Sequence, residues 1–356
     1  MPSVQLGSRF VKKHRSRQRK TLIRVLLWLI TAAVAVVVLC PGLGFSRWMS
    51  VRLGFAQVLA FSRIAGLVLL VMVACIVLAQ ICIRRPEDNS KKLTWGFIFL
   101  LVWAGLGVYL VAFPQGTSGQ VAAADMVSTR TLKIVSFNSQ DTVNAENLRH
   151  LDDAFHADVY VFPEGGVSTV STATQGAGLT GTLFEPRTQD FDGLYSEAVA
   201  PTTIFVRSSA GNFEQKPGIS LSFGSVRLQS KTANPLTILG VHTAPPLPAL
   251  MSNWRNDLGL VGEFDRQIND TQSTIVVGDF NATMRHGEMA DLENLHDAAQ
   301  LARQERGTWP TSWPSAASAP IDHILVSSGI SVERFETIVL DNGDHRAIFT
   351  ELKVAD

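Results

Sequence analysis

Asp279 and Asn281 lie just beyond the apolar run Ile275–Val277, and only Gly278 separates the aspartate from it. The run predicts a buried strand, and side chains two residues apart at a strand end point the same way. The carboxylate and the amide should therefore converge on one spot. They could hold a divalent cation and a phosphate oxygen there, because hard cations take oxygen ligands. Gly, Asp and Asn also favour turns, so this segment alone fits an ordinary turn equally well.

Polar or ionisable residues recur at other junctions between an apolar segment and a loop. In open α/β sheets, ligands bind at the ends of the strands. Six such junctions in one region favour a shared site over a set of independent turns. The other junctions carry Asn138, Glu164, His242, Asp322 and the pair Asp344 and His345.

Together these residue types suit the hydrolysis of a phosphoester. Glu164 is expected to be an anionic metal ligand, and Asp279 is expected to orient or deprotonate the attacking water. The amides of Asn138 and Asn281 could hold phosphate oxygens without adding negative charge. A bound metal would neutralise charge and activate water.

Two histidines are expected to supply protons or hydrogen bonds to the phosphate. Histidine has an ordinary pKa near neutrality, which suits both tasks, and we expect them of His242 and His345. Either Asp322 or Asp344 could orient one of the two imidazoles.

In their order along the chain, these motifs resemble those of the endonuclease/exonuclease/phosphatase superfamily, which has the deoxyribonuclease-I-like fold. The resemblance covers Thr131 to Val354. Three positions depart from the family pattern: Pro163 stands where Gln is common, Gly343 where Ser is usual, and Gln140 where some members carry an acid. The matching motifs are Ser136-Phe137-Asn138, Phe162-Pro163-Glu164, Val241-His242-Thr243-Ala244-Pro245, Gly278-Asp279-Phe280-Asn281-Ala282, Ile321-Asp322-His323-Ile324 and Asp344-His345.

The resemblance implies a Mg²⁺- or Mn²⁺-dependent hydrolase with two packed β-sheets flanked by helices, a four-layer α/β sandwich. It implies Glu164 as the principal metal ligand, with Asn138 and Asp344 near the metal. The phosphate would contact Asn138, Asn281, His242 and His345. The implied catalytic residues are His242, Asp279, Asn281, Asp322, Asp344 and His345.

Other candidate residues have more ordinary interpretations. Arg207 and Arg346 could bind phosphate, although they rank below the motif residues. Trp309 and Trp313 could line a cleft or simply pack, and His323 could be a core residue beside Asp322. Four further histidines are expected at the surface, namely His150, His156, His286 and His296.

Short strands and helices intermix over residues 131–356, as expected of an α/β sandwich with a substantial core. Within one expected helix, Leu250, Trp254 and Leu258 recur at helical spacing, so one face should pack on a sheet. The expected helices are Ala145–Phe155, Ala249–Ile268 and Gly287–Ala302. The expected strands are Leu132–Phe137, Val159–Phe162, Thr203–Val206, Leu236–Val241, Thr274–Val277, His323–Val326 and Ala347–Leu352.

The amino-terminal region differs sharply from this domain in charge. Residues 1–123 contain 15 Lys and Arg against two acids, whereas residues 124–356 contain 16 Lys and Arg against 29 Asp and Glu, a balance of −13. All three cysteines lie in the first region, so a disulfide framework is not expected.

Three long apolar segments, 22–39, 64–83 and 93–113, predict three transmembrane helices within residues 21–114. A cleaved signal peptide, or two spans with an interior domain, is the alternative. The basic arm, residues 1–20, and the loop 84–92 should be cytoplasmic by the positive-inside rule. A linker over residues 115–130 would then carry the domain outside the plasma membrane.

The negative balance of the domain counts against tight binding of a polynucleotide, because affinity for nucleic acid comes from phosphate neutralisation. Membrane spans would hold the site beside lipid headgroups, and the basic arm could contact anionic lipids. The favoured substrate is therefore a lipid or envelope phosphoester. The alternatives are an extracytoplasmic DNA or RNA endonuclease of the same fold and, from another class, an inactive membrane scaffold. The sequence implies no protein partner.

Overall fold

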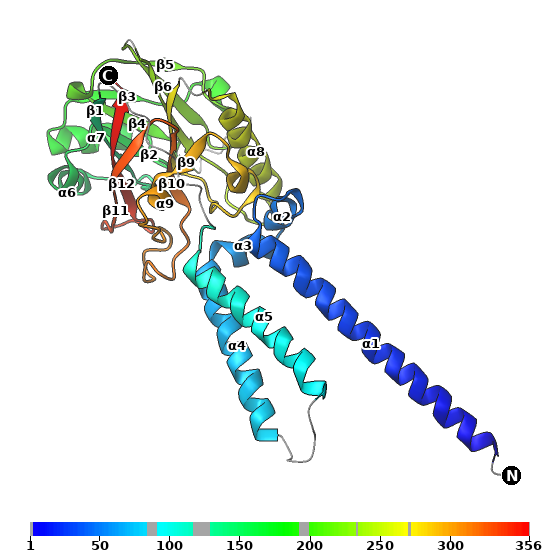
Figure 1. Ribbon diagram of the computed structural model, residues 1–356. Helices are drawn as coiled ribbons and strands as arrows, with labels where there is room; N and C mark the ends of the chain where they lie inside the picture. The colour runs from blue at the N-terminus through cyan, green and yellow to red at the C-terminus, as the bar shows by residue number, and fades with distance from the viewer. Residues whose placement is uncertain are drawn as a thin grey trace.

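Two six-stranded β-sheets, packed face to face, form the body of the protein in the computed structural model (Figure 1). The structure describes residues 3–83, 91–116, 129–191, 199–232, 234–269 and 272–355, with the backbone alone for 3–17, 83 and 91–95. The first sheet contains, in spatial order, β11 (Ser331–Ile338), β12 (Ala347–Ala355), β1 (Thr129–Ser136), β2 (Val159–Phe162), β4 (Thr203–Arg207) and β3 (Gly181–Phe184). The second contains β5 (Phe213–Lys216), β6 (Ser225–Ser230), β7 (Leu236–His242), β8 (Ser273–Asp279), β10 (Asp322–Ser327) and β9 (Leu295–Asp297).

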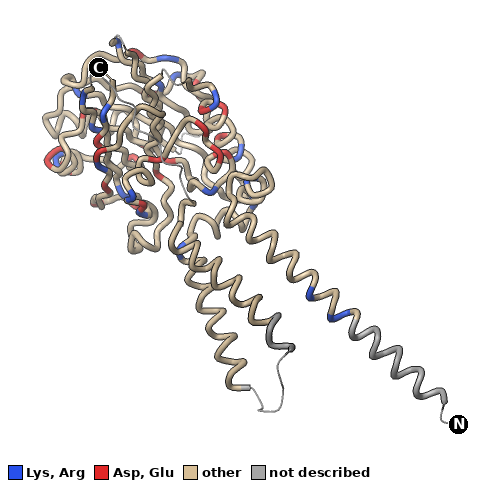
Figure 2. Tube along the Cα trace, in the orientation of Figure 1, with Lys and Arg blue, Asp and Glu red and all other residues tan. Residues whose placement is uncertain are grey.

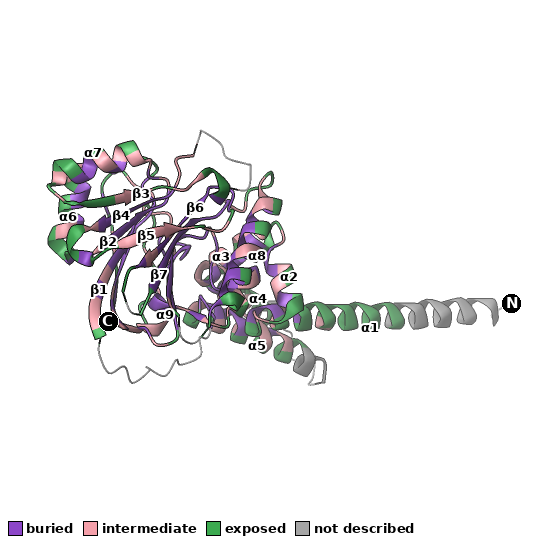
Figure 3. Ribbon diagram, turned by 90° about the horizontal axis from the view of Figure 1, so that it is seen from above, coloured by how far each residue is buried: buried purple, intermediate pink, exposed green. Residues whose placement is uncertain are grey.

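The central strands are buried on both faces because each sheet lies between the other sheet and a layer of helices. Alternate residues of a strand face opposite sides. Ile134 and Ile275 lie in the core between the sheets, whereas their neighbours Val135 and Val276 pack outward against helices. The burial colouring in Figure 3 shows these layers, and the predicted sandwich is confirmed. The covering helices are α6 (Ala145–Phe155) and α7 (Val167–Ala177) on the first sheet and α8 (Met251–Gln267) on the second.

One predicted helix of the domain, Gly287–Ala302, is wrong. The segment instead forms a 3₁₀ turn, Gly287–Asp291, then the edge strand β9, and then the short α9 (Ala298–Leu301). The carboxylate of Asp265 accepts the backbone N–H groups of Glu293, Asn294 and Leu295. These bonds replace helical ones, because an N–H that donates to a side chain is no longer available to the helix.

The amino-terminal helices project from one end of the sandwich (Figure 1). Apart from Arg63 near its start, α4 carries no charged residue, and the described side chains of α5 carry none either (Figure 2). We call this segment, residues 3–116, the helical region. Its helices are α1 (Ser3–Leu39), α2 (Gly44–Ser50), α3 (Phe55–Ala60), α4 (Ser62–Ile83) and α5 (Lys91–Ala112).

Among the described residues, two helices rather than the predicted three contain a segment long and apolar enough to cross a membrane. These segments are Gln18–Leu39 and Ser62–Cys82. The described apolar part of α5, Gly96–Ala112, is shorter. At about 1.5 Å per residue it spans about 25 Å, less than the roughly 30 Å of a bilayer's hydrocarbon core.

The predicted linker begins as an ordered part of the domain surface. Gln115 is buried, and its Oε1 accepts the backbone N–H of Met284 at 2.9 Å. Its backbone carbonyl accepts from Gln300 at 3.3 Å. Residues 117–128 of the predicted linker lie outside the described residues. Therefore Gln115 and Gly116 belong to the junction between the helical region and the sandwich.

Candidate active site

The register of the second sheet aligns three of the predicted site residues. His242 of β7 pairs with Asp279 of β8 in parallel register, and Asp279 pairs with Asp322 of β10 in antiparallel register. Residues paired across neighbouring strands have closely spaced Cβ atoms. The imidazole and the two carboxylates therefore lie side by side at one end of this sheet.

The first sheet brings its own residues to the same end of the sandwich. Asn138 follows β1 and Glu164 follows β2, which runs parallel to β1. Asp344 and His345 precede β12, which is antiparallel to β1, so Ser136 pairs with Ile348. The residues of the two sheets thus lie together where the sheets meet.

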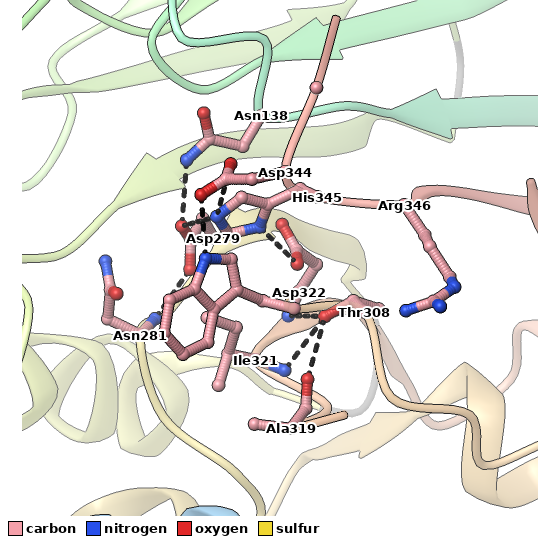
Figure 4. A network of polar contacts seen from close by, with 12 residues as sticks. Asn138, Asp279, Asn281, Thr308, Ala319, Ile321, Asp322, Asp344, His345 and Arg346 are labelled. Carbon is pink, nitrogen blue, oxygen red and sulfur yellow. Dashed lines mark hydrogen bonds and ion pairs between the residues drawn. The ribbon is translucent and has the colours of Figure 1, made fainter. Parts of the chain in front are cut away.

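Asn138 links the two sheets across this site. Its Nδ2 donates to Glu164 Oε1 at 3.0 Å and to Asp279 Oδ2 at 2.9 Å. Figure 4 shows Asn138 above Asp279, with His345 beside them. Because amide hydrogens bridge the two acids, Asn138 reduces the repulsion between carboxylates from different sheets.

His345 is surrounded by acids. Its Nδ1 lies 2.9 Å from Asp322 Oδ2, and its Nε2 lies 3.8 Å from both Asp279 Oδ2 and Asp344 Oδ1 (Figure 4). Burial alone would lower the pKa of His345, but the three carboxylates outweigh it and raise the pKa to about 10. His345 is therefore an imidazolium at neutral pH, a form that can stabilise a nearby negative charge.

His242 has the opposite character. Its Nε2 lies 3.6 Å from Glu164 Oε1 and 3.8 Å from Asp279 Oδ2, while its ring packs against Phe223. Complete burial, reinforced by the positive charge of His345, lowers the pKa of His242 to about 4 despite the attraction of Asp279. The two histidines of the site are thus held in different protonation states.

Asp279 lies at the centre of the site. Burial and the neighbouring charge of Asp322 raise its pKa, while the two histidines oppose that shift. Its Oδ1 accepts the backbone N–H of Asn281 at 2.7 Å. The amide of Asn281 donates to the carbonyl of Thr243 at 3.0 Å, so the loops after β7 and β8 are tied together.

Two site residues occupy left-handed backbone conformations. Glu164 has φ of 50° and Asn281 has φ of 46°. A left-handed conformation costs about 1–2 kcal/mol for most residues, and such strain concentrates at functional sites. Here it turns the chain immediately after the strand so that both side chains point into the site.

The donor set fits a hard divalent cation. Ligand atoms of Asp279, Asp322 and His345 lie within 4.8 Å of one another, but the bond between Asp322 and His345 already occupies one atom of each. The remaining oxygens are better donors. Asp322 Oδ1 and Asp344 Oδ1 are buried without a hydrogen-bond partner, and a buried carboxylate oxygen is stabilised by a cation.

Several expectations about other residues need correction. Arg207 pairs with Asp152 at the opposite end of the first sheet. The guanidinium of Arg346 donates to the loop 307–318 and points away from the site (Figure 4). His286, predicted at the surface, is 1% exposed, because it packs under Trp254 and contacts Ala56 of the helical region. His150 and His156 are exposed as predicted, and His296 is half-buried.

Further residues hold these side chains in position, and of these the sequence analysis missed Asp257. Trp309 Nε1 donates to Asp344 Oδ2 at 2.8 Å, which favours the cleft-lining interpretation of that tryptophan. Asp257 of α8 accepts the backbone N–H of Ala244, two residues after His242, at 2.8 Å. Asp257 had a sequence signal, since an acid beside Trp254 and Leu258 falls on the buried face of the helix. His323 is buried and contacts the carbonyl of Ala282 at 2.9 Å.

Fold and site together define a four-layer α/β sandwich of the kind found in phosphoester hydrolases. Residues 142–345 match the model of the Endonuclease/Exonuclease/phosphatase family. The chain belongs to this family, whose members are typically metal-dependent phosphoester hydrolases.

Solved structures resemble the chain to similar degrees, and the first of them supports the fold. A D. rerio TDP2 humanized by 14 mutations has a TM-score of 0.50 and 19% identity, over 63% of this chain and 99% of that chain. D. rerio TDP2 complexed with a single-strand DNA product has a TM-score of 0.49 and 19% identity, over the same shares. An endonuclease/exonuclease/phosphatase from Beutenbergia cavernae has a TM-score of 0.48 and 14% identity, over 64% of this chain and 72% of that chain. A comparison with curated proteins gives no match.

Proposed function

We propose that this chain is a membrane-anchored, Mg²⁺- or Mn²⁺-dependent phosphoester hydrolase that acts on a lipid headgroup or another envelope phosphoester. One observation supports the hydrolase assignment above all: residues from six strand ends converge on one site. The metal would be held by Glu164 and Asp344, with Asn138 beside them. When bound, it would neutralise phosphate charge and lower the pKa of a coordinated water.

The residues of the chain divide the remaining work. Asp279 orients the attacking water, because its Oδ2 faces Asn138, His242 and His345 from the centre of the site. The imidazolium of His345 stabilises the charge that develops on the phosphate, and Asp322 fixes its ring through Nδ1.

The neutral ring of His242 and the amide of Asn281 contact phosphate oxygens without adding charge of their own. Their mutual distance, 3.5 Å between His242 Nε2 and Asn281 Nδ2, lets both reach the same oxygen. Asn138 holds Glu164 and Asp279 in position and offers its amide to the phosphate.

The surfaces of the apolar helices support a membrane location. Only 17% of the apolar window in Gln18–Leu39 and 6% of that in Ser62–Cys82 is buried within the structure. A core helix of a soluble protein would be covered on one face or more. An acyl environment would cover these side chains, and the third apolar helix, α5, would complete the anchor by pairing with α4.

The rim between the helices and the site supports a lipid substrate. Leu247 and Trp313 are exposed apolar residues of the sandwich. The first lies beside Pro246, whose carbonyl accepts from Gln57 of α3, and the second packs on Phe61. An apolar rim next to membrane helices suits contact with a bilayer surface.

Charge supports an extracytoplasmic domain. The ends of α1, α4 and α5 remote from the sandwich carry or adjoin the basic segments 9–20 and 84–92. Basic segments remain on the cytoplasmic side. The sandwich, at the other ends of these helices (Figure 1), would then lie outside the plasma membrane.

The test compares substrates on the solubilised full chain. Extracted membrane phospholipids in mixed micelles and plasmid DNA are incubated in parallel with Mg²⁺ or Mn²⁺. We expect lipid turnover that is lost with a chelator and falls about 10²–10⁴-fold in Asp279→Asn. The exposed acid Asp153 supplies the matched control, Asp153→Asn, which should retain full activity.

The outcomes separate the alternatives. DNA cleavage without lipid turnover, lost in Asp279→Asn, would replace the lipid hydrolase with a nuclease. Absence of turnover for both substrates and for bis-p-nitrophenyl phosphate, with both metals, would favour an inactive membrane scaffold.

A further inference from the structure

Arg285 connects the loop of Asp279 and Asn281 to the helical region. It follows Asn281 by four residues and is 1% exposed. Its Nη1 donates to Val38 O at the end of α1 at 2.8 Å. Its Nε and Nη2 donate to Pro114 O at 2.8 Å and Phe113 O at 2.5 Å, just beyond α5. One guanidinium therefore joins the ends of two helices to the loop that carries the central aspartate.

These contacts suit the chemistry of a helix end. The last carbonyls of a helix have no partner within it and carry partial negative charge. A guanidinium offers several N–H donors in a rigid fork and remains charged when buried. The aromatic ring of Tyr109 in α5 adds a cation–π contact, 5.4 Å from the guanidinium carbon.

The residues beside Arg285 are held in the same way. The backbone N–H of Met284 donates to Gln115 Oε1 at 2.9 Å, and that of Gly287 donates to Ser50 Oγ at 2.9 Å. His286 Nε2 lies 3.0 Å from the carbonyl of Ala56. Thus, from Met284 to Gly287, every residue of the loop contacts the helical region.

Two further loops of the site rest on the helical region. Gln57 Nε2 donates to the carbonyl of Pro246, in the loop that follows His242, at 2.7 Å. The ring of Phe61 lies 6.2 Å from that of Trp309, whose indole donates to Asp344. Three loops at this end of the second sheet, those after β7 and β8 and the one before β10, are therefore in contact with these helices.

We propose that Arg285 is a positioning residue, through which the ends of α1 and α5 hold Asp279 and Asn281 in their catalytic arrangement. The helical region is then part of the active site as well as an anchor. This inference rests on the proposed hydrolase function. It also means that a sandwich cut free near residue 124 loses the partners of Arg285, so the full chain is the form to assay.

The test uses the solubilised full chain with bis-p-nitrophenyl phosphate and the phospholipid micelles, under saturating Mg²⁺. Arg285→Met removes both the positive charge and the guanidinium N–H donors. Arg285→Lys keeps the positive charge but not the guanidinium. Arg207→Met is the matched control, because Arg207, like Arg285, donates to a backbone carbonyl. Arg207 also pairs with Asp152 and lies at the far end of the first sheet. Gln115→Ala tests the same loop with a smaller change.

A loss of alignment at the reacting centre lowers kcat more than it raises KM. We expect Arg285→Met to lower kcat about 10–100-fold, with a partial recovery in Arg285→Lys. Gln115→Ala should show a smaller loss in the same direction. Arg207→Met should change kcat by less than about twofold once activity is corrected for the folded fraction, since it alters stability without touching the site.

Hydrogen exchange of the segment 280–287 gives a readout that does not depend on activity. It should accelerate in Arg285→Met and remain at the wild-type rate in Arg207→Met. The proposal is overturned if kcat of Arg285→Met matches that of Arg207→Met, or if exchange in 280–287 is unchanged. If the wild-type chain hydrolyses none of the substrates, the hydrolase assignment fails, and the exchange comparison alone decides whether Arg285 holds the loop.

Discussion

His242 and His345 illustrate how position determines the chemistry of a residue. Both lie near Asp279, yet burial lowers the pKa of His242 to about 4, whereas the acids around His345 overcome burial and raise its pKa to about 10. Pairs of titratable groups whose environments separate their pKa values typically divide acid and base tasks. In the proposed reaction, His345 supplies positive charge and His242 a neutral hydrogen-bonding ring.

Asp322→Asn should change the pH profile of the proposed activity. Without this carboxylate, burial of His345 is less fully offset and its pKa falls toward or below the ordinary 6.5. The wild-type imidazolium persists until pH approaches 10, whereas in the variant the charged fraction falls about tenfold per pH unit above the new pKa. Between pH 6 and pH 9, the activity of Asp322→Asn should therefore decline, whereas the activity of the wild type should stay constant.

The exposed Asp341→Asn is the control for this titration and should follow the wild-type profile. A parallel loss of activity at every pH in Asp322→Asn would mean that Asp322 only orients the ring. It would also mean that the charge of His345 is not needed.

At the scale of single residues, the sequence indicated which side chains come together but not which contacts keep them in position. Asp279, Asn281 and His242 were predictable because each follows an apolar run whose end defines a position on the sheet edge. His286 was not, because its burial depends on Ala56, 230 residues earlier in the chain. Arg346 was misleading for a similar reason. Its partners are backbone carbonyls of a loop, which leave no pattern in the sequence.

At the scale of elements, the close approach of β7 and β8 determines the alignment of the site. Gly278 has φ of 147°, and a Cβ at this position would overlap the carbonyl of Val241. That carbonyl precedes His242, which pairs with Asp279. A glycine is therefore required immediately before the aspartate, both for its backbone conformation and for the lack of space.

Gly278→Ala should destabilise the fold and misalign the site together. The added Cβ would force an unfavourable backbone conformation and would overlap the carbonyl of Val241. We expect this to lower the free energy of unfolding by at least about 2–3 kcal/mol, and β7 must move away from β8 to make room for it. Thermal unfolding of the solubilised chain should show a lower midpoint, and the folded fraction should have reduced kcat.

Gly259→Ala is the matched control. Gly259 lies within α8, and a Cβ there would meet no atom within 4 Å. This helix should gain about 0.5–1 kcal/mol. A stable, fully active Gly278→Ala protein would contradict the role assigned to this glycine.

Strands of the sandwich differ in how readily the sequence predicts them. The parallel pair β7 and β8 has apolar residues on both faces and was predicted to within a few residues. The edge strands β5 and β11 are half-exposed and rich in charged residues, which is how edges are protected from association. Because these strands lack an apolar run, the sequence did not predict them. The structure identifies them by their pairing with β6 and β12.

At the scale of the whole molecule, Glu305 lies at the junction between the sandwich and the helices. Its backbone carbonyl accepts from Arg63 of α4 at 3.0 Å, and its Oε2 is buried without a partner. Burial, with the charge of Asp297, raises the pKa of the Glu305 carboxyl to about 7. The junction therefore carries a group that is protonated in the folded state and ionised in the unfolded state between about pH 4.5 and 7.

This difference makes the stability of the junction depend on pH. Between those pH values the folded state binds more protons, so stability falls as pH rises. The contribution is fully present below 4.5 and is lost once pH passes about 7. The melting midpoint of the wild type should therefore fall more from pH 5 to pH 8 than that of Glu305→Gln, whereas the exposed Glu333→Gln should behave as the wild type. Equal slopes for all three proteins would rule out Glu305 as the titrating group.

The cysteines of the chain can test the proposed orientation in the membrane. Cys40 follows α1 on the side of the sandwich, Cys82 lies in the last turn of α4 at the far end, and both are exposed. Cys75 lies within α4, where an acyl environment would suppress the reactive thiolate. In variants that keep one cysteine each, a membrane-impermeant maleimide should label Cys40 in intact cells and Cys82 only after permeabilisation, with Cys75 unlabelled throughout. The reverse order for Cys40 and Cys82 would put the sandwich in the cytoplasm. Labelling of all three in intact cells would mean that α4 does not cross the bilayer, and the substrate would then have to be sought among soluble phosphoesters.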